Sequence, residues 1–408
     1  MANGPTSTSL FLFTLRYPYG TGETFIENEL RVLSELFATI YIFPLSSVGF
    51  SRELPENVKV VHWEDSYRYE GKKALTKHFF HFFKIFIFEF FRSGTKIKMV
   101  KKFAELRSSL LQNLTRADCI SQYIDKKANV APVFYSFWFS DWATVLGVLK
   151  EKRIIPNYFS RAHGFDLYAE RRKDDLMPFR NFQLHTVKKL FAVSKAGVDY
   201  LCKEYQNSCS KIKLGFLGVF DHGLNPMKEE GVFTLVSCSN LVPLKRIHLI
   251  IEILKNVKIN TQWIHFGDGA LKEKLMEQSL QLPTNIKIDF RGQVSNKEIL
   301  EFYKATPVNL FINASTSEGI PVSIMEAVSF GIPVVATNVG GTAEIVNSKT
   351  GILIPCNFDC SMVAEIINSH KTHYISSIKF RKGVRDFWAD NFDAVENYKL
   401  FYSQITID

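Results

Sequence analysis

The sequence predicts an α/β protein with two doubly wound domains, each built on a parallel sheet that helices cover on both faces. The chain has 408 residues, which at about 150 residues per domain indicates two or three domains. Hydrophobic residues make up 46% of the chain and charged residues 22%, a globular composition that excludes a disordered or collagen-like chain. Short apolar runs alternate with stretches of helical periodicity, and this alternation is typical of parallel sheets.

The alternation is clearest in the second half of the chain. The expected strands there are residues 232–237, 263–266, 286–290, 308–312 and 334–336. Apolar residues between 247 and 254 recur at i, i+3, i+4 and i+7, which is one face of a helix. A further helix is expected over 322–330, because Gly331 and Pro333 follow it. Ligands of such sheets bind beyond the carboxyl ends of the strands.

The first half shows the same alternation, with strands expected at residues 10–15, 40–43, 133–135, 158–160 and 190–193. A helix is expected over 25–36, and a glycine-rich linker over 213–230. We therefore expect an N-terminal Rossmann-like domain of residues 1–213 and a C-terminal one of residues 214–386. Residues 387–408 form a helical stretch that we expect to pack back on the N-terminal domain.

One basic, phenylalanine-rich segment carries most of the net charge of +9, because residues 72–107 hold ten Lys and Arg against two Glu. Residues 79–91 read FFHFFKIFIFEFF, which is too short and too interrupted to span a bilayer. Aromatic residues flanked by lysines are typical of a helix that lies in a membrane interface. We expect peripheral membrane contact through residues 79–107, and the alternative is a buried aromatic helix with a solvated basic flank. Nucleic-acid binding is not expected.

The cysteines and the start of the chain favour a cytoplasmic protein on the inner face of the cell membrane. None of the six cysteines forms a C-x-x-C pair, so we expect six reduced thiols. The first residues lack the basic region, the long apolar stretch and the cleavage site of a signal peptide. No run of about 18 apolar residues predicts a transmembrane helix.

Residues 313–344, NASTSEGIPVSIMEAVSFGIPVVATNVGGTAE, carry the most specific chemistry. Seven residues separate Glu318, in a loop after a strand, from Glu326, just over one turn into the next helix. Both carboxylates can therefore face one cleft, where they would accept hydrogen bonds from sugar hydroxyls. The residues between them bring open N–H groups to a helix start, which is a site for phosphate.

This E-x7-E element and the trailing GIPVVATNVGG resemble the retaining family-4 glycosyltransferases with the GT-B fold. The resemblance covers residues 232–367 and, more loosely, YPYGTGETFIENEL and RAHGFDLY in the first half. Those two stretches resemble the branch that builds bacterial exopolysaccharides, capsules and O-antigen-type chains. The resemblance implies two Rossmann-like domains that face a central cleft.

The resemblance also implies roles for single residues, with His163, Lys245 and Glu318 as the catalytic ones. His163 would face the donor sugar, and Lys245 would neutralise the leaving diphosphate. The family often has an Arg five residues before this Lys, where the present chain has Asn240. Arg246 could replace that missing cation, although its spacing differs, and Gly22 lies in a glycine loop that could admit a phosphate or the acceptor. The other expected nucleotide-sugar-binding residues are Gly267, Gln293, Val294, Gly319, Ile320, Val322, Ser323 and Glu326. In the first half, Glu23, with Glu27 as a rival, is a candidate carboxylate on the acceptor side.

The expected function is the retaining transfer of a hexose from a nucleoside-diphosphate sugar to a saccharide acceptor, with a lipid-linked oligosaccharide as the expected form. Such an enzyme would act in cell-surface polysaccharide biosynthesis. No D-x-D pair, H-E-x-x-H motif or histidine cluster occurs, so we expect no metal and no cofactor besides the donor substrate. Two alternatives stay open: a nucleotide-sugar 2-epimerase of the same fold, and a non-catalytic GT-B scaffold.

Overall fold

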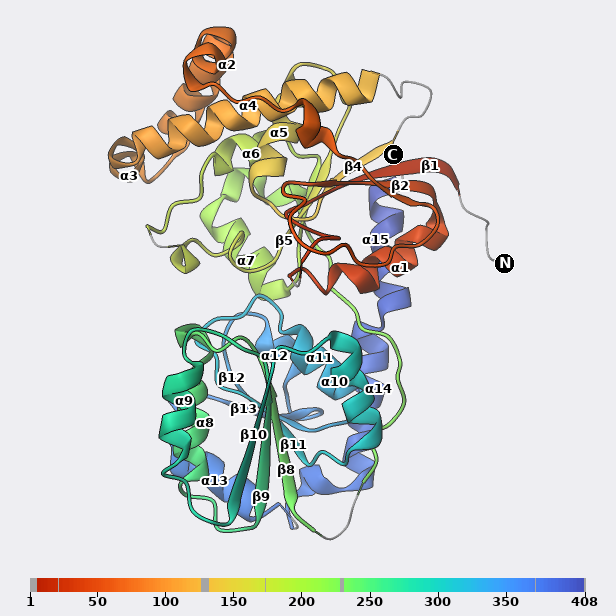
Figure 1. Ribbon diagram of the computed structural model, residues 1–408, viewed down its shortest axis with the longest axis vertical. Coiled ribbons are helices and arrows are strands. Elements are labelled where there is room, and N and C mark those ends of the chain that lie inside the picture. The colour runs from red at the N-terminus through yellow and green to blue at the C-terminus, as the bar shows by residue number, and fades with distance from the viewer. Residues whose placement is uncertain are drawn as a thin grey trace. The chain divides into compact units, whose positions relative to one another are not determined.

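The computed structural model describes residues 6–20, 22–125, 132–172, 174–227, 231–370 and 372–406. The first five residues, Thr21 and residues 228–230 of the expected linker lie outside the described residues. The chain divides into two compact units (Figure 1). The first comprises Met1–Phe216 together with Tyr398–Asp408, and the second comprises Leu217–Asn397.

The end of the second unit differs from the division expected at residue 387. Helix α14 (Ile378–Phe392) lies in the second unit over its whole length, and the chain enters the first unit only at Tyr398, within α15 (Ala394–Thr406). The reason is a bridge at Val219, whose N–H donates to Phe392 and whose carbonyl accepts from Ala394. This bridge holds the end of α14 in the second unit.

The first unit contains a seven-stranded parallel sheet in the order β3-β2-β1-β4-β5-β6-β7. Its strands are β1 (Thr6–Thr14), β2 (Phe37–Pro44), β3 (Val58–Val60), β4 (Val133–Ser136), β5 (Phe159–Ala162), β6 (Lys189–Ala192) and β7 (Ile212–Leu214). Its other helices are α1 (Ile26–Leu36), α2 (Gly71–Arg92), α3 (Lys96–Lys101), α4 (Phe103–Asp125), α5 (Asp141–Glu151), α6 (Arg180–Thr186) and α7 (Lys195–Glu204).

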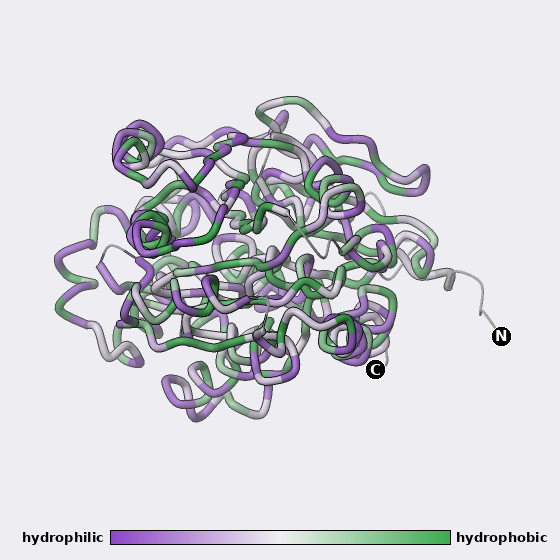
Figure 2. Tube along the Cα trace, turned by 90° about the horizontal axis from the view of Figure 1, so that it is seen from below, coloured by the Kyte–Doolittle hydropathy of each residue, from purple (hydrophilic) through white to green (hydrophobic). Residues whose placement is uncertain are grey.

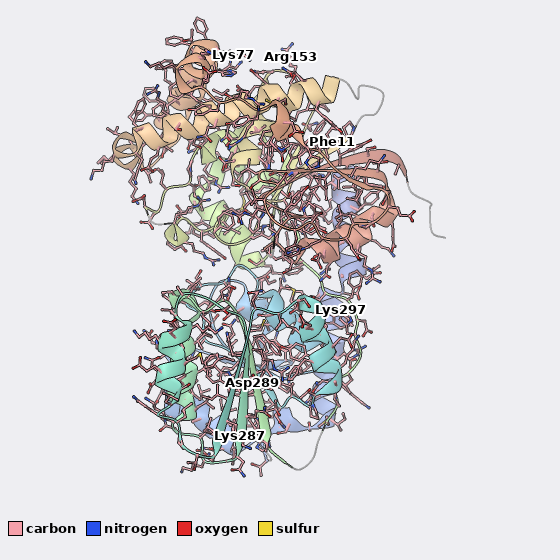
Figure 3. All side chains as sticks on the ribbon, in the orientation of Figure 1. Phe11, Lys77, Arg153, Lys287, Asp289 and Lys297 are labelled. Atoms are coloured by element: carbon pink, nitrogen blue, oxygen red, sulfur yellow. A yellow bond between two sulfur atoms is a disulfide. The ribbon has the colours of Figure 1, made fainter. Side chains whose placement is uncertain are left out.

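Alternating side chains of β1 build two cores in this unit, as a strand with both faces covered requires. Phe11 and Phe13 point into the core that also contains residues of α2, α4, α5 and α7. Leu10 and Leu12 point into the opposite core, which contains residues of α1 and α15. Figure 3 labels Phe11 within the sheet. The expected parallel sheet with helices on both faces is therefore confirmed for this unit.

The second unit contains a six-stranded parallel sheet in the order β10-β9-β8-β11-β12-β13. Its strands are β8 (Phe233–Cys238), β9 (Thr261–Phe266), β10 (Ile286–Gly292), β11 (Leu310–Asn313), β12 (Val334–Thr337) and β13 (Gly351–Ile354). Its helices besides α14 are α8 (Ile247–Leu254), α9 (Lys272–Ser279), α10 (Asn296–Ala305), α11 (Val322–Ser329), α12 (Thr342–Ile345) and α13 (Cys360–Asn368). Helices α8, α9 and α13 cover one face of the sheet, and α10, α11 and α14 cover the other (Figure 1).

Burial follows the usual pattern, with hydrophobic strands inside each unit and hydrophilic segments, drawn purple in Figure 2, on outer loops and helices. None of the described helices is both long and apolar enough to cross a bilayer. Cys202 and Cys209 form a disulfide near the end of α7, so the expectation of six reduced thiols is wrong for these two. The other four cysteines are free.

Candidate functional site

The strand order of the second sheet creates a topological switch point between β8 and β11. From β8 the chain continues to β9 and β10 on one side, and it then returns to β11 on the other side of β8. Ligands of open parallel sheets bind at such a point, beyond the carboxyl ends of the strands. Lys245 follows β8 and Glu318 follows β11, so the sequence of the chain brings both to this position.

Lys245 and Glu318 form an ion pair at the switch point, with 2.6 Å between Lys245 Nζ and Glu318 Oε1. The Asn313 side-chain amide donates to the same oxygen over 3.3 Å. Burial by itself would raise the pKa of Glu318, but the Lys245 ammonium, together with hydrogen bonds from Ser315 and Asn313, holds the pKa of this carboxyl below its ordinary value. Glu318 is therefore a buried, ionised acceptor next to a cation that remains one-fifth exposed.

The start of α11 presents open amides beside this pair. Pro321 precedes the helix and provides no side-chain cap. Among the described residues, the amides of Gly319, Ile320, Val322 and Ser323 donate to no acceptor. Unsatisfied N–H groups and the positive end of the helix dipole together favour an anion at this position.

The glycine pair after β12 fits against the loop that carries Glu318. Gly340 has φ +51°, and a Cβ there would collide with the backbone carbonyl oxygen of Glu318. The N–H of Gly341 donates to the Gly319 carbonyl over 2.9 Å. The loop before α11 is therefore held by backbone contacts that a larger residue at position 340 would break.

Glu326 lies inside α11 and is almost fully buried. Its Oε1 accepts one hydrogen bond, of 2.6 Å, from the side-chain amide of Asn296. Burial raises the pKa of Glu326 to about 7, and the Asn296 bond only partly opposes that rise. A buried carboxyl with a single polar partner is poised to accept hydrogen bonds from hydroxyls of a ligand.

The side chain of Arg246 binds backbone carbonyls and is not a free cation for phosphate. Its backbone is left-handed, with φ +49°. Its guanidinium donates to the backbone carbonyls of Ala314, Ser315 and Cys356. Arg246 therefore holds the loop after β11 in place, while Asn240, at the position of the missing Arg, is exposed.

The remaining site residues expected in this unit also lie at the carboxyl ends of strands. Gly267 has φ +132°, and a Cβ there would collide with the Ser239 carbonyl. Its N–H donates to Gly292 over 2.8 Å, so the ends of β9 and β10 are held together. Gln293, which is exposed, and Val294, which is half-buried, follow β10. The sequence-predicted residues of the second unit thus cluster at the carboxyl ends of the strands of its sheet.

His163 lies in the first unit, directly after β5, in an aromatic box. Its ring centroid is 4.6 Å from that of Phe137 and 4.5 Å from that of Trp138. Nδ1 lies 3.8 Å from the Asp166 carboxylate, and neither ring nitrogen has a hydrogen-bond partner among the described residues. Burial lowers the pKa of His163 although Asp166 acts in the opposite direction, so the imidazole is neutral at pH 7.

The glycine loop of the first unit offers fewer free hydrogen-bonding groups than expected. Gly22 is exposed, and its carbonyl accepts from Arg52. Glu23, the candidate carboxylate on the acceptor side, accepts from the amides of residues 15–17 and from the indole N–H of Trp138. Its oxygens are therefore used to hold the turn after β1, and the rival Glu27 pairs with Arg52 at 2.9 Å.

The sequence reasoning missed two asparagines that hold the two acids. Asn313 ends β11 and binds Glu318, and Asn296 begins α10 and binds Glu326. The capping box of Ser295 and Glu298, which is visible in the sequence as S-x-x-E, fixes the start of α10 and so the place of Asn296. Among the described residues, no group of three or more His, Cys, Asp or Glu could hold a metal ion.

Comparisons with known proteins point to one class. Residues 225–385 match the family model described as "Glycosyl transferases group 1". A 41.2 kDa protein from the cps region of Klebsiella pneumoniae is 32% identical over 221 residues, 52% of this chain and 53% of that protein. The alpha-monoglucosyldiacylglycerol synthase of Streptococcus pneumoniae is 26% identical over 178 residues, 40% of each protein. The chain therefore spans about half the length, or less, of these curated relatives.

The whole chain matches solved structures, although at low identity. The crystal structure of Anabaena Alr3699/HepE in complex with UDP and glucose superposes with a TM-score of 0.69. The match is 15% identical and covers 98% of this chain and 99% of that one. Since the strand order, the helical layers and this superposition agree, the chain has the GT-B fold.

Proposed function

We propose that this protein is a retaining glycosyltransferase that moves a hexose from a nucleoside-diphosphate sugar to a saccharide acceptor. The observation that carries the proposal is the Lys245–Glu318 ion pair beside the open amides of α11, at the switch point of the second sheet. These groups offer a cation and N–H donors to phosphate, and carboxylates to hydroxyls, within one short stretch of chain.

In the proposed reaction, the bond between the sugar C1 and the β-phosphate oxygen breaks, and the electron pair leaves with the phosphate. The amides of Val322 and Ser323 and the Lys245 ammonium stabilise the negative charge that develops there. The acceptor hydroxyl forms the new bond to C1 on the same face, and its proton leaves with the departing phosphate. Same-face attack accounts for retention, as the resemblance to the retaining family-4 glycosyltransferases implies.

The two acids take separate roles in this proposal. Glu326 accepts from the ribose hydroxyls, and Glu318 accepts from hydroxyls of the transferred sugar. His163 of the first unit, which is neutral and has open ring nitrogens, is the proposed donor to a sugar hydroxyl. Gly267, Gln293 and Val294 border the nucleotide base, where backbone atoms and the absence of a side chain at Gly267 permit close approach.

The proposal assigns the neutralisation of the diphosphate to protein groups, so transfer is expected without a divalent metal. Activity retained in excess chelator supports this assignment. Activity lost in chelator and restored by Mg²⁺ or Mn²⁺ contradicts it.

The acceptor is proposed to be a lipid-linked oligosaccharide of cell-surface polysaccharide biosynthesis. Two relatives support this choice by their printed names, one from a cps region and one a synthase of a glycosylated diacylglycerol. The test is a panel of UDP-, GDP-, ADP- and dTDP-sugars, scored first by thermal shift and then by product formation with extracted lipid-linked acceptors. The anomeric configuration of the product, read by NMR, decides retention.

Incubation of the best donor without acceptor separates the alternatives. A transferase leaves the donor sugar unchanged apart from slow hydrolysis, whereas a 2-epimerase converts it. A non-catalytic scaffold gives no product with any acceptor, and its function survives Glu326→Ala.

A further inference from the structure

Helix α2 buries one side against the first unit, where it packs on α4 and α6 (Figure 1). The buried residues of this side are Ala74, His78, Phe82, Ile85 and Glu89. They recur at steps of three and four, which is one helical face. Phe82 is only 1% exposed, so the membrane contact expected through residues 79–107 is wrong for this residue. The alternative of a buried aromatic helix is correct for this side alone.

The opposite side of α2 is apolar as well, and it is exposed. Its residues are Phe79, Phe80, Phe83, Ile87 and Phe91. At 3.6 residues per turn, their mean direction lies about 190° from that of the buried set. Phe80 is 84% exposed and Phe91 71%. A helix that is apolar on two opposite sides while only one is covered presents surface that a soluble protein normally hides.

The exposed apolar surface continues on α3, which packs against α2. Ile97 is 75% exposed and Val100 is 64% exposed, while Met99 on the inner side is buried. Phe80, Phe83, Ile87, Phe91, Ile97 and Val100 are named the outer face below. Together they place six large apolar side chains in water on two consecutive helices.

The two helices that carry the outer face, α2 and α3, contain a single acid, although Asp175 pairs with Lys98 of α3. Glu89 is the only acid between residues 71 and 103. Its carboxylate points inward and accepts from the backbone amides of Asn181 and Phe182 at the start of α6, so it fixes the orientation of α2. The acidic group of this segment is thus withdrawn from the exposed side.

Several basic residues at the ends of α2 and on α3 have no acidic partner. Lys77, labelled in Figure 3, and Lys84 are paired with Asp118 and Glu151 of the same unit. Lys72, Lys96 and Lys101 are exposed and form no ion pair within the part of the chain that the structure describes. Arg92 stacks on the Phe88 ring at 4.0 Å and likewise forms no ion pair with a described residue. Cations therefore stand at both ends of the outer face.

We propose that the outer face of α2 and α3 docks on a bilayer that carries anionic lipid headgroups. Aromatic and aliphatic side chains enter the boundary of the acyl chains, and the free lysines meet the anionic headgroups. A second copy of the chain fits this surface less well, because a two-fold contact would bring the same unpaired lysines together. The surface lies outside the donor site, so this proposal does not depend on sugar transfer.

The test is flotation of the full-length protein with vesicles of phosphatidylcholine alone and of phosphatidylcholine mixed with phosphatidylglycerol. Binding to the mixed vesicles, weak binding to the neutral ones and release at about 0.5 M salt are expected, because salt screens the lysine contribution. Two double variants, Phe80→Ser with Phe91→Ser on α2 and Ile97→Ser with Val100→Ser on α3, should each lose more than about tenfold in vesicle affinity. Lys96→Gln with Lys101→Gln should weaken binding to mixed vesicles only.

Matched controls keep the result interpretable. Leu280→Ser with Leu400→Ser removes two exposed leucines outside the outer face, at 85% and 59% exposure, and should leave vesicle binding unchanged. The unfolding temperature of every variant should stay near that of the wild type, since all targeted side chains are exposed. Wild-type binding by both outer-face variants overturns the proposal. The proposal is also overturned if the wild-type protein does not bind mixed vesicles. It is overturned as well if the wild type forms a dimer and the outer-face variants abolish that dimer but leave vesicle binding unchanged.

Discussion

Replacing Glu326 by Gln should stabilise the protein and weaken donor binding at the same time. The Glu326 carboxyl is buried with one hydrogen bond, from Asn296, and its pKa rises from an ordinary 4.5 to about 7. That difference corresponds to about 3 kcal/mol by which folding disfavours the ionised form. The Gln side chain has the same shape, keeps an oxygen for Asn296 and carries no charge, so it avoids this cost.

The effect depends on pH with a definite sign. Between pH 4.5 and about 7 the folded protein holds a proton on Glu326 that the unfolded chain has lost. The stability of the wild type therefore falls as the pH rises through this window, and the loss is complete near pH 8. Glu326→Gln should match the wild type near pH 4.5 and exceed it by up to about 3 kcal/mol at pH 8.

Thermal unfolding without donor, at pH 5 and at pH 8, measures the effect of Glu326→Gln on stability. At pH 8 the variant should unfold several degrees higher, since about 1 kcal/mol shifts the unfolding temperature by roughly 2–4 °C for a unit of this size. Isothermal titration calorimetry with the best nucleotide sugar measures the effect on donor binding, and the variant should lose at least about tenfold in affinity. Glu277→Gln, an exposed glutamate of the same unit, is the control and should change neither quantity.

A purely structural glutamate would show the opposite pattern. If Glu326→Gln unfolds at a lower temperature than the wild type at pH 8, the reasoning about its burial is wrong. If it binds the donor as well as the wild type, Glu326 does not hold the nucleotide sugar.

Three further substitutions probe the rest of the site. Lys245→Met leaves the Glu318 carboxylate without its cation and should lower kcat by about 10²–10³-fold in a steady-state assay, whereas Lys274→Met, at an exposed position, should not. Gly340→Ala places a Cβ against the Glu318 carbonyl at φ +51° and should lower the free energy of unfolding by about 1–3 kcal/mol in denaturant titrations. The control Gly383→Ala, in open space within α14, should raise it. His163→Phe keeps the aromatic packing and removes two unpartnered nitrogens, so it should preserve the unfolding temperature and lower kcat by about 10²-fold. Wild-type turnover in His163→Phe or Lys245→Met would contradict the assigned roles.

The central strands of both sheets were predictable because they are buried on both faces and appear as continuous apolar runs. The strands that the sequence analysis missed, β3, β7 and β13, all lie at sheet edges. Each has only three or four residues, and β3 and β7 carry an exposed lysine at their centre. A short strand with one solvated side gives too weak a pattern to separate from a loop.

The acids of the site were predictable, but their partners were not. Glu318 and Glu326 belong to one local motif, and local backbone geometry places both. Asn296 reaches Glu326 across 30 residues, and Arg246 reaches the Cys356 carbonyl across 110. Contacts of this kind arise only when the loops that follow different strands meet at the carboxyl ends of the strands.

In the phenylalanine-rich segment, the sequence did not predict which side of the helix is buried. Composition indicated that it contacts a membrane or a core, and the structure assigns Phe82 to the core and Phe80 to the surface. Apolar residues lie on both sides of α2, so hydrophobic periodicity alone could not choose the buried side. Glu89 would have indicated the wrong side, because an acid is ordinarily exposed, whereas its carboxylate here is buried at the start of α6.

The most direct test of the account is a crystal structure with the nucleoside diphosphate that gives the largest thermal shift. In that structure the β-phosphate should lie on the amides of Val322 and Ser323, Lys245 Nζ should lie within hydrogen-bond distance of a phosphate oxygen, and the ribose hydroxyls should bind Glu326. A nucleotide bound away from the start of α11, with the Glu326 carboxyl still bonded only to Asn296, would contradict it.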